Sequence, residues 1–260
     1  VNITTDVLLP ALIFHSVSTS ALSSQALGEI LASSSLIFII LLALGWLWVK
    51  VAGENPRSVL PALVFMNSGF LGIPLMKLWG GGEAMNLIVI FDQIQSFFMF
   101  SIGILIITGG FSRKSFASLF RSPIIWAMIL GFAFNLGGIT LPPPIATSLF
   151  FIGEAASPLA CVALGVSIRQ TRFTFHKSIF PSLLFRFVGG SLVGYLVVSL
   201  MGLTGLTRTV KLVASALPSA MFTSILPLRY GEDNQYASMM VVISTLLGVV
   251  TITLSFALAA

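Results

Sequence analysis

Charged side chains are scarce in this sequence. They make up 8% of the 260 residues, whereas hydrophobic residues make up 57%. Soluble domains carry about 25% charged residues, so the shortage excludes a soluble domain and predicts an all-α polytopic membrane protein. The single cysteine, Cys161, lies in an apolar run, which leaves neither a disulfide framework nor a cysteine metal site. The net charge of +5 is typical of loop cations in a membrane protein, and no nucleic-acid partner is predicted.

Apolar runs separated by short polar or Gly/Pro-rich turns predict nine helices. Most reach the roughly 20 residues that cross a bilayer. The lipid bilayer, in a cell (inner) membrane, is therefore the expected environment of the protein. The expected ranges are 5–21, 30–50, 57–79, 85–109, 122–138, 143–169, 178–201, 208–230 and 234–258.

Lys and Arg are distributed unequally over alternate connections, nine on one side against three on the other. This asymmetry predicts that the loop 110–121 is cytoplasmic and that the C-terminus lies outside. The larger set is Lys50, Arg57, Arg113, Lys114, Arg121, Arg169, Arg172, Lys177 and Arg229. The smaller set is Lys77, Arg208 and Lys211.

The segment 57–79 is apolar enough to cross the membrane, yet Asn67-Ser68-Gly69 lies at its middle, with Gly72 and Pro74 just beyond. Polar groups are costly at that depth, and Pro and Gly weaken a helix. One interpretation is a broken helix of the kind that forms binding sites in secondary transporters. The other is a kinked helix whose small residues let a neighbour pack closely.

The interrupted segment has a counterpart later in the chain. A shift of 151 residues lays Ser68 on Ser219 and places Asn67-Ser68-Gly69 on Pro218-Ser219-Ala220. The two segments are five predicted helices apart, so they cross the membrane in opposite senses and predict an inverted repeat. The expected units are a first repeat at 1–109, a loop at 110–121 and a second repeat at 122–260. The first repeat is expected to lack its first helix in this chain.

These motifs resemble those of the auxin efflux carrier family, including its bacterial organic-anion members. The stretch from Asn67 to Leu75 is similar to the fourth-helix motif, and Leu217-Pro218, with Tyr230 at the helix end, is similar to the ninth. Leu8-Leu-Pro10-Ala-Leu-Ile-Phe14 resembles the second helix, and Asp92-Gln93 lies where bacterial members often have a similar pair. The resemblance implies two five-helix repeats, with the fourth and ninth helices broken and crossing at mid-membrane.

The resemblance also implies that Asn67 lies at the substrate carboxylate, and that a scaffold domain and a transport domain move against each other. The second motif departs from the plant members, because Ser-Ala-Met-Phe-Thr223 follows Pro218 without a second proline. This difference argues against auxin itself as the substrate.

Few polar residues lie inside the predicted helices. Asp92, within an apolar run, should face a cavity or carry a proton; capping a broken helix is the structural alternative. Glu154 is a second candidate for coupling, with a structural role equally open. Arg186 is expected to be structural, because a cation near a helix end can snorkel, and His15 is expected mainly to pack.

The sequence therefore predicts a secondary transporter of a small organic anion that works by alternating access. The expected substrate-binding residues are Asn67, Ser68, Gly69, Asp92, Pro218 and Ser219, with coupling to H⁺ or Na⁺ through Asp92 or Glu154. No catalytic residue, metal or cofactor is predicted, and a homodimer is an open possibility. The alternatives are a sodium-coupled symporter of the bile-acid carrier type, an intramembrane hydrolase using His15, Asp92 or Glu154, and a non-transporting sensor.

Overall fold

Apolar residues dominate every long segment, and the chain folds into helices accordingly. The computed structural model describes residues 2–19, 26–110, 112–113, 117, 120–156, 158–159, 162, 165–166, 169 and 176–259. In these residues no β-strand is present apart from one isolated bridge. The first half contains η1 (Thr4–Leu8), α1 (Leu9–Thr19), α2 (Ala26–Ala52), α3 (Pro56–Val64), η2 (Ser68–Gly72), α4 (Ile73–Phe98), η3 (Met99–Gly103) and α5 (Ile104–Ile107). The second half contains α7 (Pro123–Leu136), α8 (Pro143–Glu154), α10 (Ile179–Leu184), η4 (Phe185–Gly189), α11 (Gly190–Leu200), α12 (Gly205–Ser215), α13 (Phe222–Arg229) and α14 (Gln235–Ala259).

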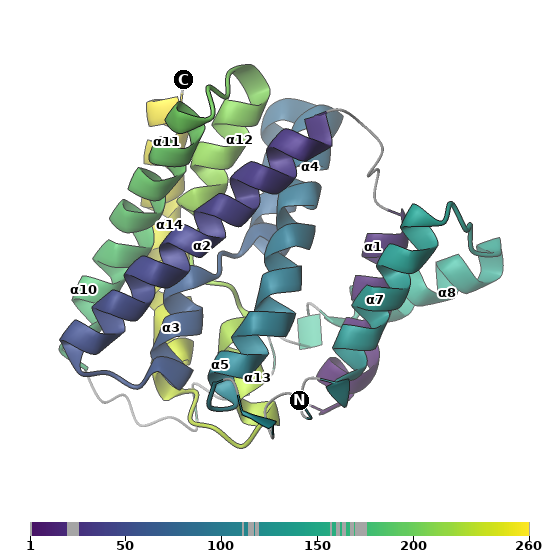
Figure 1. Cartoon of the computed structure of the whole chain (residues 1–260), viewed down its shortest axis with the longest axis horizontal. Helices are drawn as coiled ribbons and strands as arrows, with labels where there is room; N and C mark the ends of the chain where they lie inside the picture. Colours follow the sequence, from purple (N-terminus) through teal and green to yellow (C-terminus); the bar gives the residue numbers. More distant parts are fainter. Residues whose placement is uncertain are drawn as a thin grey trace.

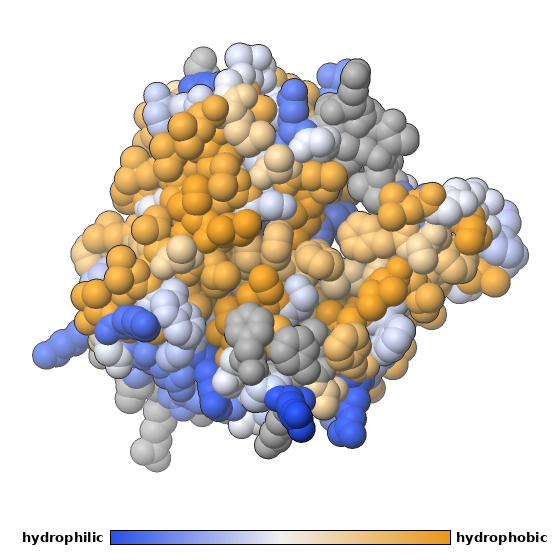
Figure 2. All heavy atoms as spheres, viewed as in Figure 1, coloured by the Kyte–Doolittle hydropathy of each residue, from blue (hydrophilic) through white to orange (hydrophobic). Residues whose placement is uncertain are grey.

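Four of the described helical segments are long and apolar enough to cross a membrane. They are Gly28–Ala52, Ser68–Ile107, Ile179–Leu200 and Gln235–Ala259. Figure 2 shows apolar side chains in a broad band over one face, with hydrophilic residues gathered at its lower edge. An apolar surface of this kind suits lipid rather than water. The predicted class, an all-α membrane protein, is confirmed.

The helices fall into two groups. Helix α1 packs against α7 and α8, and these three lie together at the right of Figure 1. Helices α2, α3, α4 and α10 to α14 form the larger group at the left, in which α12 packs against α2, α4, α11 and α14. The N-terminal residues thus belong to the smaller group, although α2 to α5, which follow directly, belong to the larger.

The predicted helices agree with the described ones, with one difference of detail. The long segment from Ser68 to Ile107 joins two predicted helices, and Gly80 and Gly81 break it. Gly81 has a φ of 66°, which favours glycine, so the chain turns here between the two parts. Residues 20–21 and parts of the predicted loop 110–121 and helix 143–169 lie outside the described residues. The inverted repeat and its boundaries stay a prediction.

Both segments expected to be broken are interrupted, and they meet at the interruptions. Helix α3 ends at Val64 and η2 begins at Ser68, while α12 ends at Ser215 and α13 begins at Phe222. Met66 and Ser219 form an antiparallel bridge, in which the Asn67 N–H donates to the Pro218 carbonyl at 2.8 Å and the Ala220 N–H to the Phe65 carbonyl at 2.9 Å. The predicted crossing is confirmed. The first break lies slightly earlier than expected, because Ser68 and Gly69 already belong to the following helix.

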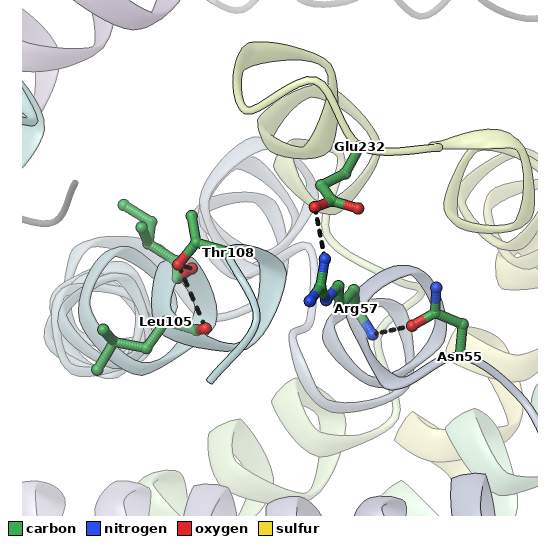
Figure 3. Close-up of polar contacts among 6 residues, drawn as sticks. Asn55, Arg57, Leu105, Thr108 and Glu232 are labelled. Carbon is green, nitrogen blue, oxygen red and sulfur yellow. Dashed lines mark hydrogen bonds and ion pairs between the residues drawn. The ribbon is translucent and has the colours of Figure 1, made fainter. Parts of the chain in front are cut away.

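An ion pair ties two of these elements together at one end of the molecule. Arg57, at the start of α3, donates from Nη1 to Glu232 Oε1 at 2.8 Å, and Glu232 follows α13 (Figure 3). The Asn55 side chain caps the same helix by accepting from the Arg57 N–H at 3.1 Å. A Cβ on Gly109 would lie 2.6 Å from Arg57 Nη2, so glycine allows the guanidinium to reach the end of α5.

Candidate functional site

Breaking a helix inside a membrane frees backbone groups that need new partners. At the first break, the Gln95 side chain supplies them for Met66. Its Oε1 accepts from the Met66 N–H at 2.9 Å, and its Nε2 donates to the Met66 carbonyl at 2.5 Å. The same Nε2 lies 3.0 Å from Ser68 Oγ. The Gln95 amide thus pairs with both backbone groups of Met66, as a peptide group of a neighbouring strand would.

Arg186 satisfies the last carbonyls of both half-helices. Its Nη1 donates to the Leu63 and Val64 carbonyls at 2.8 and 3.2 Å, and its Nη2 donates to the Ser215 carbonyl at 2.5 Å. The side chain is fully buried. A cation at the carbonyl end of a helix is stabilised by the helix dipole. The structural role expected for Arg186 is therefore borne out, although it lies at the crossing and does not snorkel to the membrane surface.

Ser68, Pro218 and Ser219 also hold the crossing together. The Ser219 hydroxyl donates to the Ala62 carbonyl at 2.7 Å, and its N–H donates to Ser244 Oγ at 3.1 Å. Ser68 and Ser219 are completely buried, and neither they nor Pro218 lines the adjacent cavity. Their contacts in this conformation are with the protein, and direct contact with a substrate stays a prediction for them.

A cavity of about 640 Å³ lies beside the crossing, between the two groups of helices. This volume is typical of small-molecule sites. Residues of α1 and α8 line one side, and residues of the crossing, α4 and η3 line the other. Its aromatic lining residues are Phe70, Phe100 and Phe222 on the side of the crossing and Phe150, of α8, on the opposite side. Its polar residues are Ser16, Asn67, Lys77, Asp92, Gln93, Gln95, Ser96 and Glu154.

Asp92 lies at the cavity wall against the backbone of the first break. Its Oδ1 accepts from the Ser68 hydroxyl at 2.7 Å. A Cβ on Gly69 would come within 3.1 Å of the same oxygen, so glycine lets the carboxyl group approach the start of the helix closely. Asn67 and Gly69 line the cavity as well. Three of the predicted substrate-binding residues therefore share one wall.

The starts of two half-helices face this cavity. Asn67 precedes the first turn of η2, and Met221 precedes that of α13, which continues to Arg229. Both residues line the cavity, as do Phe70 and Phe222 in the turns that follow. The first N–H groups of a helix have no partner within the helix, and the helix dipole places partial positive charge there. The wall can therefore attract a negatively charged group.

Two further charged residues, Glu154 and Lys77, line the cavity. Glu154, at the end of α8, lies across from the crossing on the other group of helices. Lys77, on α4, also lines the cavity, and it lies three residues before the turn at Gly80 and Gly81. Its assignment to the outer side of the membrane stays a prediction. His15, on α1, packs against the Phe150 ring at 5.5 Å between centroids. The packing role expected for His15 is borne out.

The comparisons with known proteins show the family to which the chain belongs. The sequence matches the family described as "Membrane transport protein" over residues 1–116 and 110–256. The chain belongs to this family. It is 28% identical to an uncharacterized transporter of Methanothermobacter thermautotrophicus over 96% of the chain and 84% of that protein. It is 27% identical to an uncharacterized transporter of Methanocaldococcus jannaschii over 97% of the chain and 86% of that protein.

Membership of the membrane transport protein family confirms the resemblance to auxin efflux carriers, and the protein is a membrane transporter.

Two polar residues of the larger group of helices could not be recognised from the sequence. Gln95 is one amide among several in its segment, and only the fold shows that it pairs with Met66. Lys211 was assigned to an outer loop, but it is buried within α12. The membrane orientation stays a prediction.

Proposed function

We propose that this transporter carries a small organic anion, such as a carboxylate, and that the anion binds in the cavity beside the crossing. The observation that supports this most strongly is the meeting of Asn67 with the starts of two half-helices at one cavity wall. Backbone N–H groups and a side-chain amide donate hydrogen bonds to a carboxylate without burying a full opposite charge. An anion held in this way can still be released.

The carboxyl groups of the cavity suggest why a proton would accompany the anion. Asp92 and Glu154 line the same space as Asn67, and two ionised acids would repel an anion. A proton on Asp92 removes one of these charges beside the binding wall. We therefore propose that the anion enters together with a proton on Asp92 and leaves after that proton is lost.

The position of the cavity suits alternating access. One wall belongs to α1 and α8 and the other to the crossing and α4. The described contacts that join the two groups include the 2.5 Å hydrogen bond from Gln93 Nε2 to Ser16 Oγ and the ion pair between Arg229 of α13 and Asp6 of η1. Movement of one group against the other would expose the cavity first on one side of the membrane and then on the other.

A thermal-shift screen of the purified protein tests this proposal. Acetate, succinate and benzoate would be compared at pH 5.5 and 7.5, because they differ in size, charge and aromatic character. We expect at least one carboxylate to raise the melting temperature in a saturable way, more strongly at the lower pH. The Asn67→Ala variant should respond less. Absence of a saturable shift with all three carboxylates at both pH values would contradict an organic-anion site.

A further inference from the structure

The buried ammonium group of Lys211 lies behind the crossing and takes no part in the proposed anion site. Its side chain is 1% exposed. Nζ donates to the Ile30 carbonyl at 3.1 Å and to the Ser34 hydroxyl, both on α2. It also lies 4.9 Å from the centroid of the Phe91 ring on α4. A carbonyl, a hydroxyl and an aromatic face are all neutral groups that attract cations.

No carboxylate balances this charge in the described part of the chain. The acidic residues on the helices packed against α12 are Glu29, Glu83 and Asp92, and none forms an ion pair with Lys211. Burying an ammonium group is costly unless its surroundings replace its hydration shell. The oxygens of Ile30 and Ser34 and the ring of Phe91 provide that replacement. The site is thus built to hold a cation.

A small cavity connects this site to the polar network of the crossing. It has a volume of about 10 Å³, room for about one water molecule, and is lined by Ser34, Phe91 and Gln95 among others. Gln95 bonds to Met66 and Ser68, and Ser68 bonds to Asp92. The ammonium group and the anion site therefore lie at opposite ends of one short chain of polar groups.

We propose that Ile30, Ser34 and Phe91 form a binding site for a small monovalent cation, and that the ammonium group of Lys211 is its tethered occupant. If the protein carries anions as proposed above, the charge that a coupling cation would bring to the crossing is already built into the chain. Anion binding then requires no sodium ion. This assignment argues against sodium coupling of the bile-acid carrier type.

The test compares melting temperatures of the purified protein in sodium, choline and methylammonium chloride at equal ionic strength, without any carboxylate. Lys211→Ala removes the tethered ammonium and leaves space, whereas Lys211→Met fills that space with an apolar chain of similar length. We expect the unmodified protein to melt at the same temperature in all three salts. Lys211→Ala should melt lower and should be stabilised by methylammonium in a saturable way, while Lys211→Met should not respond.

Two results would overturn the proposal: stabilisation of the unmodified protein by sodium over choline, or equal responses of the Ala and Met variants to methylammonium. If Lys211→Ala does not fold, Ser34→Ala gives the answer instead. Ser34→Ala should clearly lower the melting temperature of the protein that keeps Lys211. It should leave the melting temperature of Lys211→Met unchanged. An equal loss in both backgrounds would show that Ser34 does not serve the cation. Because no carboxylate is present in this test, its failure leaves the proposed organic-anion site intact.

Discussion

The Ser68 hydroxyl donates a 2.7 Å hydrogen bond to Oδ1 of Asp92. Ser68 opens the helix after the first break, and Asp92 lies on α4 at the cavity wall. The charge of this carboxyl group therefore acts next to the backbone of the crossing. Both protonation states can accept the Ser68 bond, but only the ionised state adds a negative charge to the wall.

Replacing Asp92 with Asn should remove most of the pH dependence of transport. The amide has the shape of the protonated acid and can still accept from Ser68, so anion binding should persist. Wild-type uptake should be greater at acidic than at neutral pH, whereas uptake by Asp92→Asn should vary little between them. Initial rates of carboxylate uptake into proteoliposomes from pH 5 to 8 would measure this.

Glu154→Gln is the matched control, because Glu154 also lines the cavity but lies on the other group of helices. Its pH profile should follow that of the wild type. If Asp92→Asn keeps the wild-type profile and Glu154→Gln loses it, the proton is carried by Glu154, and Asp92 serves the structure of the crossing.

Gly69→Ala should impair anion binding without unfolding the protein. The added Cβ would lie 3.1 Å from Asp92 Oδ1, so the carboxyl group would have to shift by a few tenths of an ångström. Crowding of this kind typically costs about 1–3 kcal/mol. Gly82→Ala is the control, since a Cβ there meets nothing within 4 Å. Carboxylate affinity measured for both variants should fall only for Gly69→Ala; equal affinities would show that the Gly69–Asp92 approach is not needed.

Arg186→Gln should destabilise the protein strongly. The shorter amide cannot reach the carbonyls of both half-helices, so buried acceptors lose their partners at about 1–3 kcal/mol each. Arg121→Gln, at an exposed position, should change stability by less than about 0.5 kcal/mol. Thermal unfolding in detergent would compare the two. Similar melting temperatures would mean that the crossing does not depend on the Arg186 guanidinium.

The ion pair between Arg57 and Glu232 should contribute little to stability. The two side chains are 43% and 28% exposed, and such pairs are usually worth about 0–1 kcal/mol. A double-mutant cycle with Arg57→Gln and Glu232→Gln should give a coupling energy within that range. A coupling energy of several kcal/mol would show that this contact holds α3 and α13 together far more strongly than its exposure suggests.

The crossing could be predicted from the sequence because its cause is local. Asn67, Gly72 and Pro74 interrupt an apolar run, and a similar interruption recurs at Pro218. The partners of the freed backbone groups could not be predicted in the same way. Arg186 reaches Leu63, 123 residues away, and Lys211 reaches Ile30, 181 residues away. The apolar pattern of a helix does not show which neighbour each of its faces will contact. Lys211 lies near the start of its predicted helix, so it was counted with the loop cations.

The most direct test of anion binding at the crossing is uptake of a labelled carboxylate into proteoliposomes by the wild type and by Asn67→Ala. A hydrogen bond to a charged group contributes about 1.5–3 kcal/mol, so we expect the half-saturating concentration to rise about tenfold or more. The melting temperature without substrate should stay close to that of the wild type. Uptake by Asn67→Ala with an unchanged half-saturating concentration, or no carboxylate uptake by the wild type, would contradict the account.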